Sequence, residues 1–255
     1  MIKFFRKIRQ NLIKENKVTK YVLYAIGEIF LVVIGILIAL QINNVNEANK
    51  TRERELSYLR GIKADLSLNL LELQKTVKAR EAHIESSNII IDYYENQLVE
   101  DLDHFNLHVI NVCLWFPSDF NNNTFQELLN SGNLAIISND SIKNDLLNMD
   151  IGYKKIRYLE NHIQHDLDIL IYDQYYTFAD VNSSIKNYFQ QVGNSPENRV
   201  DIGKERVQLL LESQKFKNGC ALIIFNNNSL IEKYNNMIST TNKLITRIDN
   251  EMETK

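Results

Sequence analysis

The sequence predicts an all-α protein in which a single N-terminal transmembrane helix is followed by an antiparallel helical bundle. Three observations support this class. An apolar segment at residues 21–42 (YVLYAIGEIFLVVIGILIALQI) is long enough to cross a membrane. Long stripes of apolar residues with the helical period follow it. Only 8 Gly and 2 Pro occur in 255 residues, which argues against the many tight turns of a sandwich, a barrel or a repeated βαβ fold.

The apolar segment at residues 21–42 is predicted to be the only membrane span. As a helix it reaches about 33 Å, against roughly 30 Å for the hydrocarbon core of a bilayer. It carries one carboxylate, Glu28, whose insertion cost is smaller than the gain from the apolar residues around it. No later part of the sequence is comparably apolar, so residues 43–255 are expected to lie outside the bilayer as one helical domain.

Basic residues indicate the orientation of the span. Seven Lys and Arg precede it and four follow closely, so the N-terminus is expected in the cytoplasm. Within residues 1–20, four apolar side chains share one side of a helical wheel, which indicates a basic amphipathic segment lying on anionic lipid: Phe4, Phe5, Ile8 and Leu12. The alternative for residues 1–20 is a simple basic topology signal. The alternative for the span is a cleaved signal peptide, but Ala39 followed by Gln41 makes a poor cleavage site.

The first long helix outside the membrane is predicted from Leu56 onward, continuing weakly to Trp115 and ending at Pro117. Its apolar residues fall on one side of a helical wheel: Leu59, Ile62, Leu66, Leu70, Leu73, Val77, Ile84 and Ile91. No helix breaker lies between Leu40 and Leu59. The membrane helix is therefore expected to continue directly into this one.

A short helix is predicted next, with Thr124 and Glu127 as a capping box and Gly132 at its C-terminal end. The SNDS sequence at 138–141 supplies an N-cap for a second long helix. This second long helix is predicted over 142–178. A polar connection with Gly193, Pro196 and Gly203 separates it from a short helix at 204–214 and a last helix at 217–251. Amphipathic helices of this length bury their apolar stripes by packing on one another, which is the basis for predicting a bundle.

Charge and cysteine content narrow the possible partners. The net charge is −3, the sequence pI is about 6.0, and acids and bases are mixed outside the first 20 residues, so no nucleic-acid-binding surface is expected. Cys113 and Cys220 lie among apolar neighbours. They are interpreted as buried thiols or, in an oxidising compartment, as a disulfide, but not as metal ligands.

Recognised enzyme motifs are absent from the sequence: there is no phosphate-binding loop, dinucleotide fingerprint, nucleophile elbow, CxxC or HExxH. We therefore expect neither catalytic activity nor a cofactor. Two histidine pairs, His104 with His108 and His162 with His165, have spacings that allow one metal to be held from a single helix, but ordinary exposed polar faces explain them better. A group of tyrosines is interpreted as a contact surface or as bundle packing: Tyr153, Tyr158, Tyr172, Tyr175 and Tyr176.

The membrane helix has one face suited to helix contact. Glu28 shares that face with Ala25, Val32, Gly35 and Ala39, and Gly35 with Ala39 forms a small-xxx-small pair that permits close approach. A carboxylate beside such a groove predicts a partner helix with a complementary donor. The alternative is a snorkelling acid that has no partner.

The block at residues 15–46 (ENKVTKYVLYAIGEIFLVVIGILIALQINNVN) closely resembles the opening of a bacterial family of single-pass membrane proteins of unknown function. That opening usually ends in a tryptophan, whereas this chain has Val45. The segment at 124–138 (TFQELLNSGNLAIIS) is similar to a second family element. The resemblance implies an inner-membrane protein of a Gram-negative bacterium with a periplasmic helical domain at residues 43–255, and it implies no activity.

Two functions from different classes follow. The first is a non-enzymatic, bitopic inner-membrane protein whose periplasmic domain binds a partner or ligand, and which assembles with itself or another membrane protein through its membrane helix. The second is an accessory subunit of an ion-driven or transport complex that uses Glu28. A periplasmic hydrolase has no motif to support it.

Overall fold

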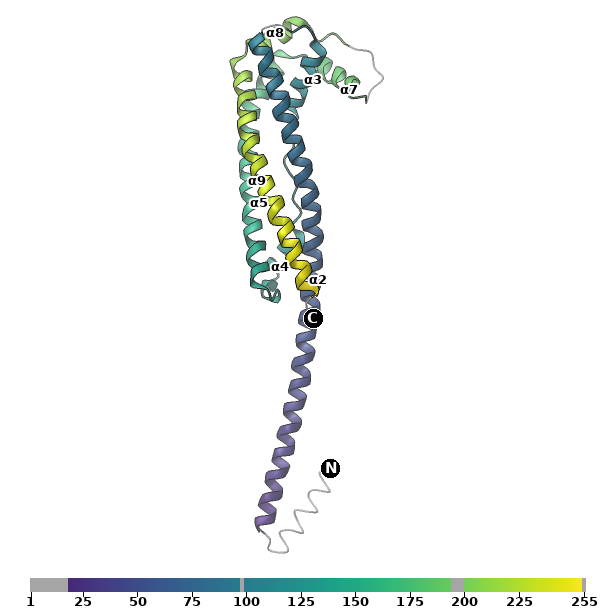
Figure 1. Cartoon of the computed structure of the whole chain (residues 1–255), viewed down its shortest axis with the longest axis vertical. Coiled ribbons are helices and arrows are strands. Elements are labelled where there is room, and N and C mark those ends of the chain that lie inside the picture. The colour runs from purple at the N-terminus through teal and green to yellow at the C-terminus, as the bar shows by residue number, and fades with distance from the viewer. Residues whose placement is uncertain (1–17, 97–98, 194–199, 254–255) are drawn as a thin grey trace. The chain divides into compact units, whose positions relative to one another are not determined.

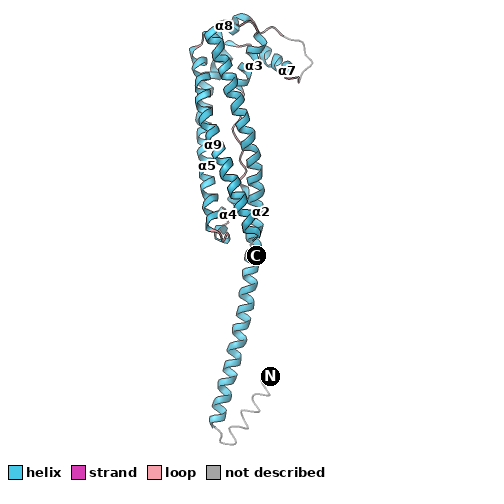
Figure 2. Ribbon diagram, in the orientation of Figure 1, coloured by secondary structure: helices cyan, strands magenta, loops and turns pink. Residues whose placement is uncertain are grey.

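The computed structural model describes residues 18–96, 99–193 and 200–253 (Figure 1). Helices make up all the regular structure of these residues and no strand occurs among them, which confirms the all-α class (Figure 2). The chain divides into two units, Met1–Ser57 and Tyr58–Lys255. Most of the predicted basic segment at residues 1–20 falls outside the described residues, so its amphipathic helix stays a prediction.

The described part of the first unit is a single exposed helix. It is the beginning of α2 (Val18–Asn96). An 18-residue window of this helix has a mean hydropathy of 2.6, and none of that window is buried. By length and composition, α2 is the one helix among the described residues that is able to cross a membrane. Exposure of apolar side chains on all sides of a helix to water is unfavourable, so this helix is expected to be surrounded by apolar groups.

The second unit contains the rest of α2 and the described helices that follow it in the sequence. These are α3 (Leu102–Cys113), α4 (Asn123–Asn130), the 3₁₀ helix η1 (Asn133–Ile136), α5 (Asp140–Leu167), the π-helical turn η2 (Asp168–Tyr172), α6 (Asp173–Phe178), α7 (Val181–Gln191), α8 (Lys204–Glu212) and α9 (Gln214–Glu253). The apolar stripes of α2, α5 and α9 meet in one core, with Leu59, Ile142 and Leu244 completely buried.

Hydrogen bonds and ion pairs show how the long helices of this unit align. Along α2 and α9, Lys63 pairs with Asp249 at 2.6 Å and Asn227 donates to His83 at 3.0 Å. Residue numbers therefore rise along α2 as they fall along α9. In the same way, α5 and α9 contact each other at Asp145 with Arg247 and at Glu160 with Tyr234.

The predicted helix ends are partly right. Asn139 caps α5 by accepting hydrogen bonds from the backbone N–H groups of Ser141 and Ile142, as the SNDS sequence indicates. The capping box at Thr124 is wrong. The N-cap of α4 is Asn122, without a side-chain cap, and the N–H of Thr124 donates instead to Asp65 Oδ2 at 2.9 Å. A tertiary partner on α2 takes the place of the local one.

The sequence prediction missed the break between α2 and α3 and missed helix α7. The weak helical pattern expected to reach Trp115 is interrupted, because α2 ends at Asn96 and α3 begins at Leu102 with Asp101 as N-cap. Helix α7 lies in what was expected to be a polar connection, with Asp180 as its N-cap. The second long helix is found over the predicted range, but as α5, η2 and α6, with a π turn in it.

Candidate functional site

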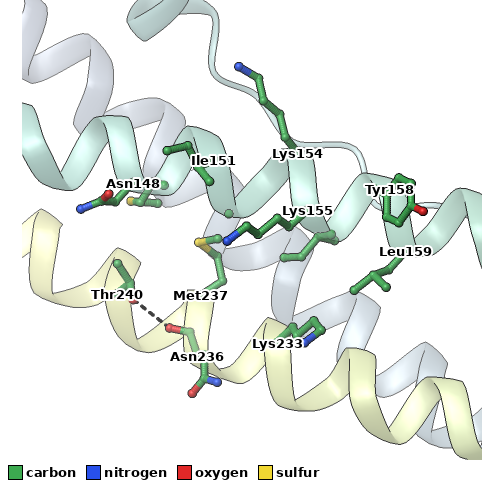
Figure 3. Close-up of a pocket in the computed structure, with 13 residues that line it drawn as sticks. Asn148, Ile151, Lys154, Lys155, Tyr158, Leu159, Lys233, Asn236, Met237 and Thr240 are labelled. Atoms are coloured by element: carbon green, nitrogen blue, oxygen red, sulfur yellow. Dashed lines mark hydrogen bonds between the residues drawn. The ribbon is translucent and has the colours of Figure 1, made fainter.

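A groove with a volume of about 880 Å³ lies between α5 and α9 on the second unit (Figure 3). This volume lies in the range of ordinary ligand or peptide sites. We call it the α5/α9 groove, and its lining residues are Asn148, Met149, Ile151, Gly152, Lys154, Lys155, Ile156, Tyr158 and Leu159 from α5, with Lys233, Asn236, Met237 and Thr240 from α9.

The floor of the groove depends on a glycine. A Cβ at Gly152 would lie 2.3 Å from Met237 Cε, so the absence of a side chain makes room for Met237 between the two helices. Met237 is buried, and Figure 3 shows it directed from α9 toward α5. Because methionine is flexible and polarisable, this floor can adapt to an apolar surface placed on it.

The groove is electropositive. Lys154 is neutralised by Asp150, with 2.6 Å between Nζ and Oδ2. Lys155 and Lys233 enter from opposite walls, and among the residues that the structure describes neither of them forms an ion pair. No Asp or Glu is among the lining residues. Within the described ranges, two ammonium groups therefore face the same opening without a carboxylate among its lining residues.

Exposed apolar side chains border the groove on α5. Leu147, Ile151 and Tyr158 are spaced so that they share the outer face of this helix. Ile151 is 49% exposed and Tyr158 is 73% exposed. Isolated apolar residues on a surface are common, whereas these three lie in a row along one helix face beside the groove.

A cluster of buried polar side chains lies in the interior between α2, α5 and α9, and it holds α5 in place. Glu160 Oε1 accepts hydrogen bonds from the Ser118 backbone N–H at 2.9 Å, the Ser118 hydroxyl at 2.7 Å and the Tyr234 hydroxyl at 2.7 Å. Arg157 donates to the Ser118 carbonyl, and its Nη1 lies 3.6 Å from Glu160 Oε2. These contacts join α5, α9 and the segment between α3 and α4.

Arg80 completes this cluster from α2. Its guanidinium carbon lies 3.6 Å from the centroid of the Trp115 ring, and its Nη2 donates to the Phe116 carbonyl at 2.6 Å. Arg80 and Glu160 are fully or almost fully buried. Arg80 and Glu160 therefore join α2, α5 and the segment between α3 and α4 from the interior of the domain.

His83 lies beside the cluster as a neutral ring. Its Nε2 donates to the Val112 carbonyl at 2.6 Å, and its Nδ1 accepts from the Asn227 amide at 3.0 Å. Burial is the main cause that lowers the pKa of His83; the Val112 hydrogen bond opposes it, the charge of Arg80 adds to it, and together they bring the pKa to about 4. The ring is therefore uncharged at neutral pH.

One family model matches residues 28–193 of this chain, described as a family of unknown function, DUF6090. The chain belongs to DUF6090. The match contains the α5 wall of the groove and ends before α9. No curated protein and no solved structure matches this DUF6090 protein.

The membrane-helix residues predicted from the sequence all lie on α2 in the first unit of this DUF6090 protein: Glu28, Ala25, Val32, Gly35 and Ala39. A Cβ at Gly35 would have no atom within 4 Å, so this part of the helix surface is open. Spacings of three and four place the five residues on one face of the helix. Their role in helix contact stays a prediction.

The two histidine pairs differ in the structure. His104 and His108 meet, with 3.3 Å between their Nε2 atoms, whereas His162 lies 3.8 Å from Asp166. No group of three or more His, Cys, Asp and Glu side chains within the described ranges is placed to hold a metal ion. Of the tyrosines, Tyr175 is buried and Tyr158 is exposed, so packing and surface roles are both present.

The cysteines of the DUF6090 protein are free thiols, and the disulfide alternative is not realised. Burial raises the pKa of both the Cys113 and the Cys220 thiol. Cys220 is buried and Cys113 is half-buried. A protonated thiol is a poor nucleophile, and the interpretation as a buried apolar residue fits Cys220 fully and Cys113 in part.

Arg80 and Glu160 were missed in the sequence although a signal was present. Each occupies a position of an apolar stripe: Glu160 falls between Ile156 and Ile163 at helical spacing, and Arg80 follows Val77 in the same way. A charged residue at a core position of an amphipathic helix indicates a buried partner. The lysines of the groove carry no such signal, since exposed lysines are common.

Proposed function

We propose that this protein is a single-pass protein of a bacterial inner membrane, whose residues 43–255 form an antiparallel helical bundle in the periplasm. The bundle binds a partner protein without catalysing a reaction, and the membrane helix keeps it at the membrane. The α5/α9 groove is the binding surface. One observation carries this proposal: Lys155 and Lys233, which form no ion pair with any residue that the structure describes, lie over a flexible apolar floor.

The occupant of the groove is an acidic amphipathic helix of another polypeptide. Lys155 and Lys233 stand on opposite walls, so a helix lying between them satisfies both with carboxylates one or two turns apart. Its apolar side faces Met237 and its edge covers Ile151 and Tyr158. A helix laid into a groove between two helices is an established mode of peptide recognition.

Site-specific photo-cross-linking in cells tests this function. A photoreactive residue replaces Asn236 in the groove or, as a matched control, Lys78 on the exposed face of α2. We expect Asn236 to form an adduct with a segment that carries an acidic row, identified by mass spectrometry of the adduct, and Lys78 to form none. The double variant Lys155→Glu/Lys233→Glu removes the adduct, while Lys155→Arg/Lys233→Arg retains it.

The proposal is wrong if the Asn236 adduct is absent, is unaffected by charge reversal, or is matched by the Lys78 control. An adduct with a second copy of this chain also contradicts it, because the groove then serves self-association. Circular dichroism of each variant verifies that the helical domain has formed, so loss of the adduct is attributable to the surface change.

The orientation is tested separately with reporter fusions. The excess of Lys and Arg before residue 21 predicts a cytoplasmic N-terminus. A reporter that is active only in the periplasm is expected to work after Lys255 and to fail before Met1. The reverse pattern overturns the periplasmic location without affecting the groove itself.

A further inference from the structure

His104 and His108 form a compact pair on α3. The two residues are one helical turn apart, and their Nε2 atoms lie 3.3 Å from each other. Their ring centroids are 4.6 Å apart, with 67° between the ring planes. His104 is exposed and His108 is half-buried, so the Nε2 side of the pair can be reached from solvent.

Hydrogen bonds from α2 fix the opposite edges of both rings. His104 Nδ1 lies 2.8 Å from the Tyr93 hydroxyl, and His108 Nδ1 lies 3.1 Å from the Ser86 hydroxyl. A hydroxyl can accept as well as donate, so both rings are able to carry their proton on Nδ1 at the same time. Both Nε2 lone pairs are then free for a ligand. Hydrogen bonds of this kind orient the histidines of metal sites.

The distance between the two Nε2 atoms suits a shared metal ion. A Zn–N bond is about 2.0–2.1 Å, so two nitrogens on one tetrahedral ion are about 3.3–3.4 Å apart. In the metal-free pair, the same spacing permits one Nε2–H to donate to the other ring. Conversion to the metal-bound form changes the tautomer of one ring, which needs no backbone movement.

The surroundings of the pair are acidic. Glu85 precedes Ser86 on α2, and its carboxylate is near enough to influence His108. Asp101, the N-cap of α3, is near enough to Tyr93 to act on its hydroxyl electrostatically. Negative charge near the pair raises the local concentration of divalent cations.

We infer that His104 and His108 together bind one late first-row divalent cation through their Nε2 atoms, with water completing its coordination. Imidazole ligands favour Zn²⁺, Cu²⁺ and Ni²⁺ over Mg²⁺ and Ca²⁺. Open coordination positions distinguish this site from a closed structural zinc site. The site is distinct from the α5/α9 groove and does not depend on the proposed partner.

Copper titration of the full-length protein in detergent, purified without a polyhistidine tag, tests the site. Calorimetry with Cu²⁺ is expected to give one site per chain, and electron paramagnetic resonance is expected to show coupling to two imidazole nitrogens. His104→Ala/His108→Ala removes this site. Tyr93→Phe weakens it by about tenfold or more, because the hydrogen bond that orients His104 is lost.

His162→Ala/His165→Ala is the matched control, since it removes two histidines from one helix that do not contact each other in the same way. It is expected to leave the copper site unchanged. Because His104 is exposed, the single variant His104→Ala provides a second test if the double variant fails to fold, and it removes two-imidazole coupling. Absence of copper binding, or binding that survives loss of both His104 and His108, overturns the inference.

Discussion

Arg80 and Glu160 approach each other in the interior of the helical domain, with 3.9 Å between Arg80 Nη2 and Glu160 Oε1. Their side chains are 2% and 0% exposed. Removing two charges from water is costly, and the cost is offset here because Glu160 accepts three hydrogen bonds and Arg80 lies over the Trp115 ring. Glu160 compensates the charge of Arg80, while Glu160 itself is compensated by both Arg80 and Arg157.

Replacement of Glu160 by Ala is expected to destabilise the domain by about 3–5 kcal/mol, because Arg80 is left buried and uncompensated. Lys154→Ala is the control, since it breaks an exposed pair and is expected to cost at most about 1 kcal/mol. Urea unfolding of the detergent-solubilised protein, followed by circular dichroism, measures both. Equal effects of the two substitutions contradict the importance of the buried pair.

The stability of the domain is expected to fall on acidification partly through His83. Burial lowers the pKa of His83 from its ordinary 6.5 to about 4 in the folded state. Between these values the unfolded chain takes up a proton that the folded chain excludes, so the contribution of this residue is complete above pH 6.5 and is lost as the pH falls toward 4.

His83→Gln removes this titration. From pH 7 to pH 5 the free energy of unfolding of the original protein is expected to fall by about 2 kcal/mol more than that of the variant. His165→Gln, on the exposed surface of α5, is the control and leaves the pH profile unchanged. Parallel pH profiles for the original protein and the His83→Gln variant show that the ring is not held neutral by burial.

The sequence predicts the all-α class and the long helices because apolar residues at helical spacing record which face of each helix is covered. It predicts an N-cap within residues 138–141, where Asn139 is found to serve, because that interaction is local. The Thr124 cap fails because its N–H bonds to Asp65, which is distant in the sequence. The α5/α9 groove and the meeting of His104 with His108 depend on tertiary packing and ring orientation, which periodicity does not encode.

Two glycines at the contact between α5, η2 and α9 are expected to respond differently to a methyl group. A Cβ at Gly219 would lie 2.5 Å from Ile171 Cδ1 and 3.1 Å from Leu170 Cβ. Leu170 Cβ cannot move without its backbone, so Gly219→Ala is expected to cost about 1–3 kcal/mol even after the gain of about 1 kcal/mol that Ala brings to a helix. A Cβ at Gly152 meets the flexible end of Met237, and Ala favours the helix by about 1 kcal/mol, so Gly152→Ala is expected to be close to neutral.

Thermal unfolding of the two glycine variants, measured side by side, checks this difference. Gly219→Ala is expected to lower the midpoint by several degrees and Gly152→Ala to change it little. A larger loss for Gly152→Ala means that Met237 is held rigidly. That result also argues against an adaptable floor in the α5/α9 groove.

The membrane helix is expected to associate through the face that carries Glu28, Gly35 and Ala39. Lipid tails are as apolar as the helix, so association in the bilayer depends on close packing and polar contacts. Gly35→Leu is expected to block close approach, Glu28→Gln to retain much of the hydrogen bonding, and Glu28→Leu to abolish it. Each polar contact contributes about 0.6–2 kcal/mol, which is about 3- to 30-fold in association.

Cysteine cross-linking along residues 21–42 measures this association, in a background that lacks Cys113 and Cys220. Cross-links that recur with the helical period on the Glu28 face support the contact surface. The identity of the cross-linked protein distinguishes the two functions: a second copy of this chain supports self-assembly, whereas a transporter or motor subunit supports an accessory role for Glu28. If the cross-links show no preferred face and Gly35→Leu has no effect, Glu28 is a snorkelling acid, because a polar residue that contacts no helix gains only by reaching the headgroups.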